Sequence, residues 1–370
     1  MGLLRIIVGG FIFSFVLNFY SYKRFISKIS FLQSHLKYIK ILFLLVSVCE
    51  FLFVLQIRFD ILNFYFYVAF ATLIGFSLFL FSVSVFYDIL RSILKRNKFS
   101  QNRRKFLKFC FDITFLILIF SYLFKGIFSA LTPPKIKQTN IKIKGLKSQL
   151  KIAMITDVHI GDFLQKEFLA TLVYQINEQK PDILVIVGDL IDFNAQKIGD
   201  FLDPLKDIKA RYGVFYVPGN HEYYHGIDGI LEKIEQVGVK ILGNKNIELD
   251  EINLAGVYDL AGIKFKHLPP NLHKALDGKN DDKPTILLSH QPKFLKTMDI
   301  SVDLVLCGHT HAGQIFPFGL LVLLDQNYLY GLYQVNDKMQ LYVSSGAGFW
   351  GPPLRILTQS EIAILNLTGE

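Results

Sequence analysis

Long apolar stretches rich in Phe, Leu and Ile dominate the first 131 residues of this 370-residue chain and restrict what this region can fold into. A helix needs about 20 apolar residues to cross a hydrocarbon layer of roughly 30 Å, and four stretches approach or exceed that length. They are apolar around most of the helix circumference, whereas helices of a soluble domain keep a polar face at a period of about 3.6 residues. The sequence therefore predicts a multi-pass α-helical membrane domain, residues 1–131, with four transmembrane helices at 3–20, 41–57, 62–86 and 109–131.

Two details of these stretches affect how they are interpreted. The first stretch has only Arg5 as a basic residue at its start and no small-x-small cleavage pattern, so we expect a retained anchor and not a cleaved signal peptide. Glu50 lies near the middle of the second stretch. A carboxylate inside a membrane span is a functional candidate, but helix-to-helix hydrogen bonding or simple protonation explains it equally well.

The distribution of Lys and Arg predicts the orientation of the chain. The loop at 23–40 carries five basic residues and the loop at 91–108 carries eight, whereas the loop between the second and third spans offers Arg58, next to Asp60. By the positive-inside rule the two basic loops face the cytoplasm, so the N-terminus and everything after Leu131 lie on the opposite side. Five lysines at and after the end of the fourth span are a counter-signal. We expect an integral protein of the cell (inner) membrane with an extracytoplasmic C-terminal domain.

The positive charge of the chain does not indicate nucleic-acid binding. The net charge is +9, but 13 of the 40 Lys and Arg residues lie in those two loops, where membrane topology and contact with anionic lipid head groups explain them. The C-terminal region has no basic stripe interleaved with aromatic residues and no recognisable nucleic-acid module. We therefore expect membrane lipids, and no nucleic acid, as partners.

A change of pattern after the fourth span marks a second domain. Residues 132–140, Thr-Pro-Pro-Lys-Ile-Lys-Gln-Thr-Asn, form a short polar linker of the kind that ends a helix. From residue 141 to residue 370 helix and strand periodicities alternate, which predicts an α/β domain of two packed sheets flanked by helices. Amphipathic helices are expected at 166–178, 199–209 and 227–237, and strand-rich segments at 240–257, 320–333, 341–344 and 361–367.

Five short motifs in this second domain contain residue types that bind metal ions, and each follows a run that is typical of a buried strand. The runs are 152–155, 183–187, 214–217, 286–288 and 304–306. Strand ends are where an α/β domain presents its site, so the motifs predict one shared metal centre. The motifs are Asp157-Val158-His159, Gly188-Asp189, Gly219-Asn220-His221-Glu222, Ser289-His290 and Gly308-His309-Thr310-His311.

The residue types in these motifs indicate the chemistry. Aspartate oxygens and neutral imidazoles suit ions such as manganese, iron and zinc, whereas an all-oxygen cage would favour calcium or magnesium. Two such ions roughly 3.5–4 Å apart can clamp a phosphate, generate a hydroxide near neutral pH and stabilise the negative charge of the transition state. The motifs therefore indicate two divalent metal ions as cofactors and hydrolysis of a phosphoester as the reaction.

The motif order resembles the D-x-H, G-D, G-N-H-E, H, G-H-x-H pattern of the calcineurin-like metallophosphoesterase superfamily, in its membrane-anchored bacterial-type branch, over roughly residues 140–370. The resemblance implies a two-sheet α/β/β/α sandwich and makes Asp189 a bridge between two metal ions. It makes His221 the non-ligand histidine that meets the phosphate and protonates the leaving oxygen, a task suited to a group whose unperturbed pKa is about 6.5. The other implied ligands are Asp157, His159 and His311 for one metal, and Asn220, His290 and His309 for the second.

Other polar residues near the motifs have simpler explanations. Glu222 is expected to orient the loop or a ligand histidine and not to bind metal. His225 is expected to be an ordinary polar loop residue, although it could line the substrate entrance. Helix capping explains Asp162 and Asp192 as well as chemistry does. A stretch that contains Lys and Pro, and is typical of a solvated surface, holds two further histidines, His267 and His273.

The loop at 344–353, Ser-Ser-Gly-Ala-Gly-Phe-Trp-Gly-Pro-Pro, is the most unusual loop of the chain and holds its only Trp. In a functional interpretation its glycine backbone approaches the phosphate while Phe349, Trp350 or Arg355 lines the substrate mouth. In a structural interpretation it is a tight turn that packs one aromatic side chain on the sheet. We favour the tight turn and do not include Arg355 among the catalytic residues.

These observations predict metal-dependent hydrolysis of a phosphomonoester or phosphodiester at the membrane surface. Four spans anchor the chain more firmly than a soluble phosphatase needs, and a nine-residue linker keeps the second domain within roughly 30 Å of the bilayer. A lipid-linked or membrane-adjacent phosphoester is therefore the expected substrate, with a small soluble phosphoester as the competing interpretation. The alternative function is a non-catalytic sensor, which would bind a phosphorylated ligand without hydrolysing it.

Overall fold

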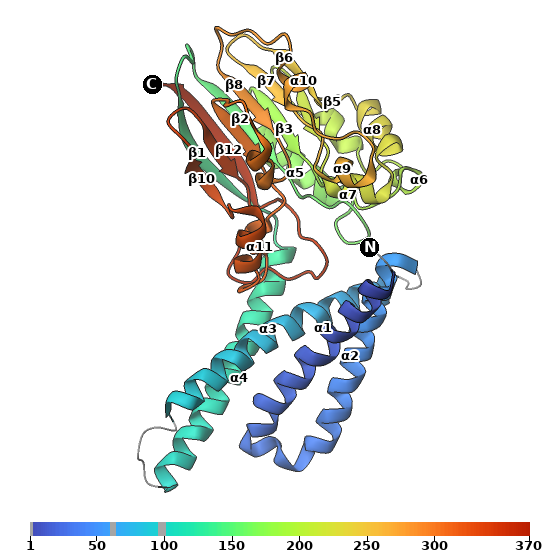
Figure 1. The fold of residues 1–370 in the computed structure, drawn as a ribbon, viewed down its shortest axis with the longest axis vertical. Coiled ribbons are helices and arrows are strands. Elements are labelled where there is room, and N and C mark those ends of the chain that lie inside the picture. Colours follow the sequence, from blue (N-terminus) through green and yellow to red (C-terminus); the bar gives the residue numbers. More distant parts are fainter. Residues whose placement is uncertain (1–2, 60–63, 95–100) are drawn as a thin grey trace. The chain divides into compact units, whose positions relative to one another are not determined.

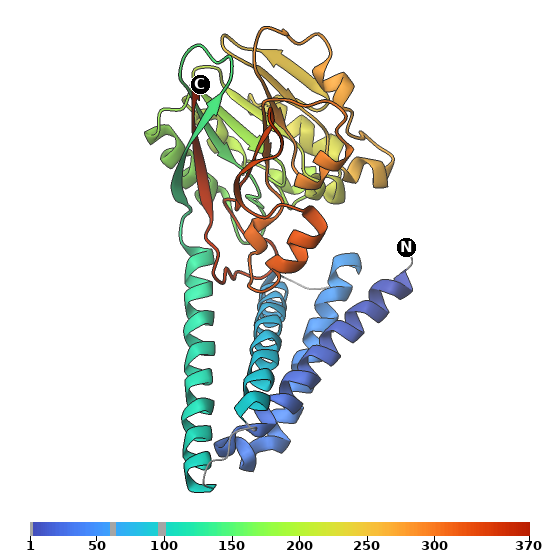
Figure 2. The same ribbon diagram turned by 60° about the vertical axis from the view of Figure 1, so that its left-hand side comes forward.

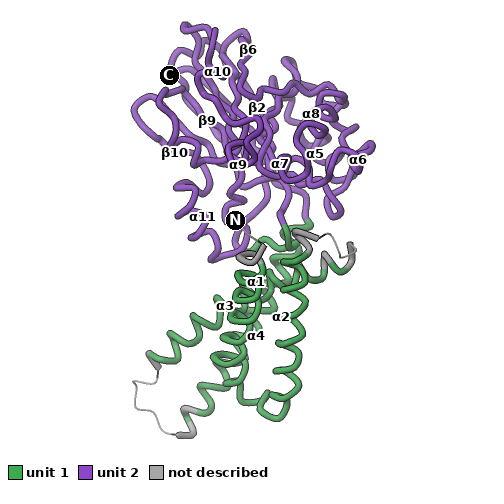
Figure 3. Tube along the Cα trace, turned by 45° about the vertical axis from the view of Figure 1, so that its right-hand side comes forward, with its two compact units in different colours: residues 1–131, 351–356 green, residues 132–350, 357–370 purple. Residues whose placement is uncertain are grey.

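The protein divides into two compact units (Figure 3). Unit 1 contains residues 1–131 and 351–356, and unit 2 contains residues 132–350 and 357–370. Unit 1 is built mainly from helices, whereas unit 2 combines strands and helices. The computed structural model describes residues 3–59, 64–94 and 101–370.

Four long helices form most of unit 1. They are α1 (Leu3–Arg24), α2 (Leu36–Phe59), α3 (Phe64–Leu94) and α4 (Gln101–Leu131), with two short 3-10 helices, η1 (Ile26–Lys28) and η2 (Ser30–His35), between α1 and α2. Within the described residues, three stretches are long and apolar enough to cross a membrane: Ser30–Leu55, Thr72–Ser92 and Lys105–Leu131. A span over α1 stays a prediction. The predicted start of the third span at Leu62, Asp60 and part of the second basic loop, residues 95–100, lie outside the described residues.

Polar side chains between the helices of unit 1 bond to one another. Glu50 on α2 is 1% exposed, and its Oε2 accepts a hydrogen bond from Asn18 Nδ2 of α1 at 2.7 Å. Ser77 on α3 donates its hydroxyl to Asn18 Oδ1 at 2.9 Å. A polar link therefore joins the three helices, which agrees with the hydrogen-bonding interpretation of Glu50.

Residues 351–356 pack against α3 and α4, where two glycines leave room for them. A Cβ atom at Gly75 would lie 3.0 Å from Leu354 Cδ2, and one at Gly126 would lie 2.8 Å from Leu354 Cδ1. The backbone N–H of Arg355 donates to the Gly126 carbonyl at 2.9 Å. Arg355 is 1% exposed and belongs to unit 1, so the interpretation in which it lines a substrate mouth is not supported.

Unit 2 contains two six-stranded sheets (Figure 1). The strands of the first are β1 (Lys135–Ile143), β12 (Glu361–Gly369), β2 (Leu150–Ile155), β3 (Ile183–Val187), β4 (Val214–Val217) and β5 (Lys240–Ile241), in that order. Those of the second are β10 (Gly331–Gln334), β11 (Gln340–Val343), β9 (Leu304–Cys307), β8 (Thr285–Leu288), β7 (Asn253–Gly256) and β6 (Lys245–Glu248). The strands β2, β3, β4 and β5 are parallel to one another, and so are β7, β8, β9 and β11.

Helices cover the outer faces of the two sheets. On the first sheet lie α5 (Lys166–Glu178) and α8 (Ile227–Gln236), and on the second lie α10 (Leu272–Leu276) and η4 (Pro292–Thr297). Apolar side chains of both sheets, such as Met154 and Ile286, fill the space between them. The predicted α/β/β/α sandwich is therefore confirmed. Shorter helices in the loops are α6 (Ala195–Ile198), η3 (Asp203–Asp207), α7 (Asn220–His225), α9 (Ala261–Phe265), η5 (His311–Gly313) and α11 (Gly319–Gln326).

The start of unit 2 differs from the prediction. Residues 135–140, which the sequence assigns to a linker, belong to β1. This strand lies beside β12, the last strand of the chain, and pairs with it in parallel from Lys135 opposite Glu361 to Ile143 opposite Gly369 (Figure 2). The residues between the end of α4 and the first strand are therefore 132–134.

Two other segments also differ from their predicted structures. The helix predicted at 199–209 does not form. The helix α6 ends at Ile198, because Gly199 follows it with a positive φ of 51°, and the predicted segment contains the short η3, which has Pro204 in its first turn. The strand-rich segment predicted at 320–333 begins with the helix α11. Short apolar runs do not distinguish helix from strand, and the leucines of this run favour a helix.

Candidate metal centre

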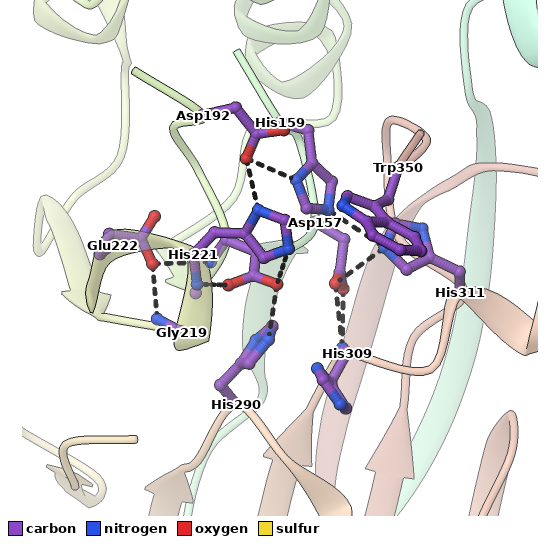
Figure 4. Close-up of polar contacts among 12 residues, drawn as sticks. Asp157, His159, Asp192, Gly219, His221, Glu222, His290, His309, His311 and Trp350 are labelled. Carbon is purple, nitrogen blue, oxygen red and sulfur yellow. Dashed lines mark hydrogen bonds and ion pairs between the residues drawn. The ribbon is translucent and has the colours of Figure 1, made fainter. Parts of the chain in front are cut away.

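The five motifs lie where the chain leaves β2, β3, β4, β8 and β9, and their side chains come together there (Figure 4). The first three strands are parallel neighbours in one sheet, and the last two are parallel neighbours in the other. Their carboxyl ends meet, because the backbone N–H of Gly308 donates to the His290 carbonyl at 2.9 Å and His290 Nδ1 bonds to the Val187 carbonyl at 2.8 Å. Motifs far apart in the sequence therefore form one cluster.

The backbone at these strand ends is strained. This left-handed conformation costs a non-glycine residue of order 1–3 kcal/mol and persists only where the surrounding packing imposes it, as it does at many functional sites. The sharp turns it creates direct polar side chains from the strand ends toward one another. The five motif residues with φ between 49° and 70° are Asp157, His159, Asp189, His309 and His311.

Two motif glycines permit the close approach of the loops. A Cβ atom at Gly219 would lie 2.2 Å from Asp189 Oδ1, and one at Gly308 would lie 2.0 Å from Thr156 Oγ1. These distances are far below van der Waals contact, so no other residue fits at either position without displacing the neighbouring loop.

The first group of candidate ligands consists of Asp157, His159 and His311, all of which are buried. His159 donates its Nδ1–H to Asp192 Oδ1 at 3.0 Å, which leaves its Nε2 with a lone pair. That Nε2 lies 3.1 Å from His311 Nε2, which in turn lies 3.3 Å from Asp157 Oδ1. Ligand atoms about 2.0–2.1 Å from a common metal ion lie about 3.3 Å apart in tetrahedral geometry, so these three atoms fit one ion.

The second group consists of Asp189, His290 and His309. His290 donates its Nδ1–H to the Val187 carbonyl, and its Nε2 lies 3.0 Å from Asp189 Oδ2. Among the described residues, neither this Nε2 nor the Oδ1 of buried Asn220 has a hydrogen-bond partner. A buried acceptor without a donor, such as Asn220 Oδ1, is costly, and a metal ion would satisfy it and could take the place of a proton on His290 Nε2.

Asp189 takes part in more than one set of potential ligands. Its carboxylate is grouped with His290 and His309, and also with His159 and His221. Burial alone would raise its pKa, but His290 and His221 outweigh burial and hold the pKa well below its usual range. Burial and the neighbouring His290 lower the pKa of His309 to about 3. An ionised carboxylate and a neutral imidazole are the forms that bind a divalent ion.

His221 lies at the rim of the cluster, with its side chain 12% exposed. Its backbone N–H donates to Asp189 Oδ1 at 2.9 Å, and its Nδ1 lies 2.7 Å from Asp192 Oδ1. The other nitrogen, Nε2, lies 4.0 Å from Asp189 Oδ2. Burial lowers the pKa of this imidazole, but the carboxylates of Asp192 and Asp189 outweigh burial and raise the pKa to about 9. This arrangement suits a proton donor at the edge of the centre.

Asp192 is the residue that sequence reasoning undervalued. Its Oδ1 contacts the Nδ1 atoms of both His159 and His221 (Figure 4). Burial would raise its pKa, but these two histidines hold the pKa well below its usual range. It does not cap α6, whose N-cap is Asn194, so the capping explanation is wrong. The available signal was its position three residues after Asp189, on the turn that leaves β3.

Glu222 orients the loops behind the centre, as the sequence predicts. Its two carboxylate oxygens accept hydrogen bonds from four backbone N–H groups at 2.7–3.2 Å. These bonds fix the turn after β3 to the start of α7 and therefore hold candidate ligands from two strands in register. The four donors belong to Gly219, Asp189, Leu190 and Ile191.

Three further histidines were predicted to lie outside the centre. His267 and His273 are exposed and pair with surface aspartates at 2.8 Å, so a solvated surface is the correct account of both. His225, at the end of α7, is half-buried, and its ring centroid lies 6.4 Å from that of His221. Burial lowers its pKa. His225 therefore lies closer to the centre than an ordinary loop residue would.

The glycine-rich loop after β11 packs against the end of β2. The backbone N–H of Gly348 donates to the Asp157 carbonyl at 2.9 Å, and a Cβ atom at Gly348 would lie 2.2 Å from the Val158 carbonyl oxygen. This close approach agrees with the tight-turn interpretation. Trp350, which is 50% exposed, also lies beside the centre, because its ring centroid is 6.2 Å from that of His221 (Figure 4).

The fold and the centre agree with similarity to known proteins. Residues 150–313 match the family model described as calcineurin-like phosphoesterase. Over 369 residues the chain is 40% identical to an uncharacterised metallophosphoesterase of Campylobacter jejuni, and the match covers 97% of this chain and 99% of that protein. The chain belongs to the calcineurin-like metallophosphoesterases.

Two further relatives extend this result. The metallophosphoesterase is 48% identical over 296 residues to one from Helicobacter pylori, with 80% of each chain covered. It is 34% identical over 258 residues to a Danio rerio transmembrane protein with a metallophosphoesterase domain, which covers 65% of this chain and 59% of that protein. The chain is therefore an enzyme of a dimetal-dependent phosphoesterase family, and its three apolar helical stretches make it a membrane protein.

Proposed function

We propose that this metallophosphoesterase hydrolyses the phosphoester of a lipid-linked or membrane-adjacent molecule at a binuclear metal centre. The observation that supports the proposal is the overlap of potential ligand groups around Asp189, which is grouped with His290 and His309 and also with His159 and His221. When bound, two metal ions supply a hydroxide near neutral pH and neutralise charge on the phosphate. Asp189 would bridge them, and the residues that would hold them are Asp157, His159 and His311 for one and Asn220, His290 and His309 for the other.

His221 provides the proton for the leaving oxygen. Its Nδ1 is engaged by Asp192 at 2.7 Å, so its Nε2–H is available to the substrate. The carboxylates of Asp192 and Asp189 raise the pKa of this imidazole, which favours the protonated form that a general acid needs. Because Asp192 also bonds to His159, one carboxylate orients both the acid and a candidate metal ligand.

A turnover assay tests the catalytic role. We expect the purified full-length protein, in detergent with Mn²⁺, to hydrolyse phosphoesters, and a panel of soluble and lipid-linked mono- and diesters identifies the substrate class. A protein that binds a phosphorylated compound without ever releasing product would be a sensor and would contradict the proposal.

Chain length and anchoring support a substrate at the membrane. The helix α4 ends at Leu131 and β1 begins at Lys135, so at most about 14 Å of extended chain connects them. A spanning helix already attaches a domain almost irreversibly, so the domain stays near lipid head groups. We expect faster hydrolysis of a lipid phosphoester in mixed micelles than of the matched water-soluble ester. Faster hydrolysis of the soluble ester would favour the competing interpretation.

We further propose that unit 2 is extracytoplasmic, on the basis of the basic residues in the loops at 23–40 and 91–108. Protease added to right-side-out spheroplasts should then digest the chain after Leu131. Protection in spheroplasts combined with digestion in inverted vesicles would show the opposite orientation.

A further inference from the structure

An uncovered apolar segment follows the candidate ligands His309 and His311 in unit 2. Residues 316–324, Phe-Pro-Phe-Gly-Leu-Leu-Val-Leu-Leu, contain no polar or charged side chain and include most of α11. Six of these side chains are 40–77% exposed, and a soluble domain rarely exposes so continuous an apolar surface without a partner. The six are Phe316, Phe318, Leu320, Leu321, Leu323 and Leu324.

Polar contacts hold the C-terminal end of α11 in place. Buried Gln326 accepts a hydrogen bond from the Lys293 backbone N–H at 3.2 Å. The carboxylate of Asp325 pairs with Lys293 Nζ at 3.1 Å. The leucines therefore project from a helix that is fixed to the body of unit 2, and their exposure is a property of the fold.

Gln314 holds the other end of the segment. Its Nε2 donates to the Trp350 carbonyl at 2.8 Å, and its Oε1 accepts from the Trp350 N–H at 3.0 Å. The hydroxyl of Thr358 donates to the Gln314 carbonyl at 2.9 Å. Trp350 and Thr358 flank residues 351–356, the segment that belongs to unit 1. The start of the apolar segment is therefore bonded to both ends of the chain segment that enters the helical unit.

Residues 351–356 pack against two candidate membrane spans. Gly75 and Gly126, against which Leu354 packs, lie in two of the stretches that are long and apolar enough to cross a membrane. Trp350 and Thr358 are therefore a few residues away, along the chain, from residues that pack against candidate membrane spans. Lipid is also the environment that favours an uncharged, leucine-rich surface helix.

We propose that residues 316–324 insert into the lipid bilayer at the boundary between head groups and acyl chains. A helix of eight residues is about 12 Å long, which suits shallow insertion and is too short to span. The bilayer then covers the apolar face that the protein leaves exposed. This insertion does not depend on the proposed function, since it needs neither metal nor turnover. If both hold, the same contact brings phosphate at head-group level to the metal centre.

Quenching of tryptophan fluorescence by brominated lipid tests the insertion, because the chain contains a single Trp. In a Trp350→Phe background, Leu324→Trp places the probe at the most exposed position of the segment, 77% exposed. Tyr174→Trp on α5, 67% exposed, is the matched control in unit 2, and Phe120→Trp on α4 is the reference for an acyl-chain environment. Each full-length variant is reconstituted into phosphatidylcholine bilayers with and without bromine on the acyl chains.

We expect the Leu324→Trp probe to lose about half or more of its emission in brominated bilayers, as the Phe120→Trp probe does, while the Tyr174→Trp probe is unchanged. Equal, unquenched emission from the Leu324→Trp and Tyr174→Trp probes would overturn the proposal. A blue-shifted but unquenched Leu324→Trp probe would also overturn it, because a second copy or another protein would then cover the segment.

Discussion

The metal centre of unit 2 and the buried Asp112 of unit 1 both hold polar side chains away from solvent, but these side chains are paired differently. In the metal centre of unit 2, His159 Nε2 faces His311 Nε2 at 3.1 Å, and among the described residues His290 Nε2 has no hydrogen-bond partner. In unit 1, the carboxylate of buried Asp112 faces donors: the Tyr87 hydroxyl lies 3.0 Å from Oδ1, and donors from Ser30 and Lys108 reach Oδ2. A cation would suit the first arrangement, whereas protein donors already satisfy the second.

At these two places it is the pairing of the buried side chains, and not their burial alone, that differs. A buried carboxylate that meets donors from several elements holds those elements together. Lone pairs that face one another at ligand spacing are destabilising until an ion binds between them. Substitutions in the two units should therefore affect different measured properties.

The largest effect is expected at Asp189. Asp189→Asn removes the negative charge that we propose bridges the two metal ions, so metal content should fall at both sites and turnover should be nearly abolished while the fold remains intact. Elemental analysis and the rate of product release measure the two effects, and Asp203→Asn on the surface is the control. A variant that kept two metals per chain and a near-normal rate would show that Asp189 does not bridge the metal ions.

A smaller loss is expected at His221, which is assigned to the leaving group and not to metal binding. His221→Ala should keep its full metal content but lose about 10²–10⁴ in rate. The loss should shrink for nitrophenyl esters, whose leaving group departs without a proton. Exposed His273→Ala should behave like the unsubstituted enzyme. Equal losses on good and poor leaving groups would exclude the acid role.

Substitution of Asp192 should lower both metal affinity and catalytic rate, by less than the losses expected at Asp189 and His221. Asp192→Ala frees the rings of His159 and His221, so we expect about a 10–100-fold loss in metal affinity or activity. Asp192→Asn keeps an acceptor oxygen and should recover part of the loss, and exposed Asp200→Asn should cause none. If Asp192→Ala lowered stability but left metal affinity and the leaving-group dependence unchanged, Asp192 would be structural only.

The smallest effect on activity is expected in unit 1. Asp112→Ala leaves the Tyr87 hydroxyl without its acceptor, which should lower the free energy of unfolding by about 1–3 kcal/mol while activity per folded molecule stays the same. Thermal unfolding in detergent measures this change, with Ile117→Ala, at an exposed position on the same helix, as the control. Lost turnover at unchanged stability would show that Asp112 has a functional role and would contradict its assignment as a structural group.

Local sequence patterns predicted the strand ends of the centre well. Each motif follows its own apolar run, and β3, β4 and α5 have the predicted bounds. Burial on both faces of a strand, or on one face of a helix, produces a hydrophobic pattern within a few consecutive residues, and this pattern can be recognised in the sequence. The α/β/β/α sandwich followed from the motif resemblance together with this alternation. Such local patterns do not predict which side chains come into contact after folding.

The features that the sequence did not predict depend on contacts between distant residues. Asp192 bonds to histidines 33 and 29 positions away, so its position alone did not separate it from a helix cap. The strand β1 looked like a polar linker because its partner β12 is at the other end of the chain. The packing of Leu354 against Gly75 and Gly126 likewise exists only in the folded protein.

The binuclear centre is tested most directly by titrating metal-free, full-length protein with Mn²⁺ while phosphoester hydrolysis is followed. We predict no activity without metal, full activity at two equivalents per chain, and no recovery in Asp189→Asn protein at the same metal concentration. Full activity in the presence of a chelator, or saturation at one equivalent, would contradict the account.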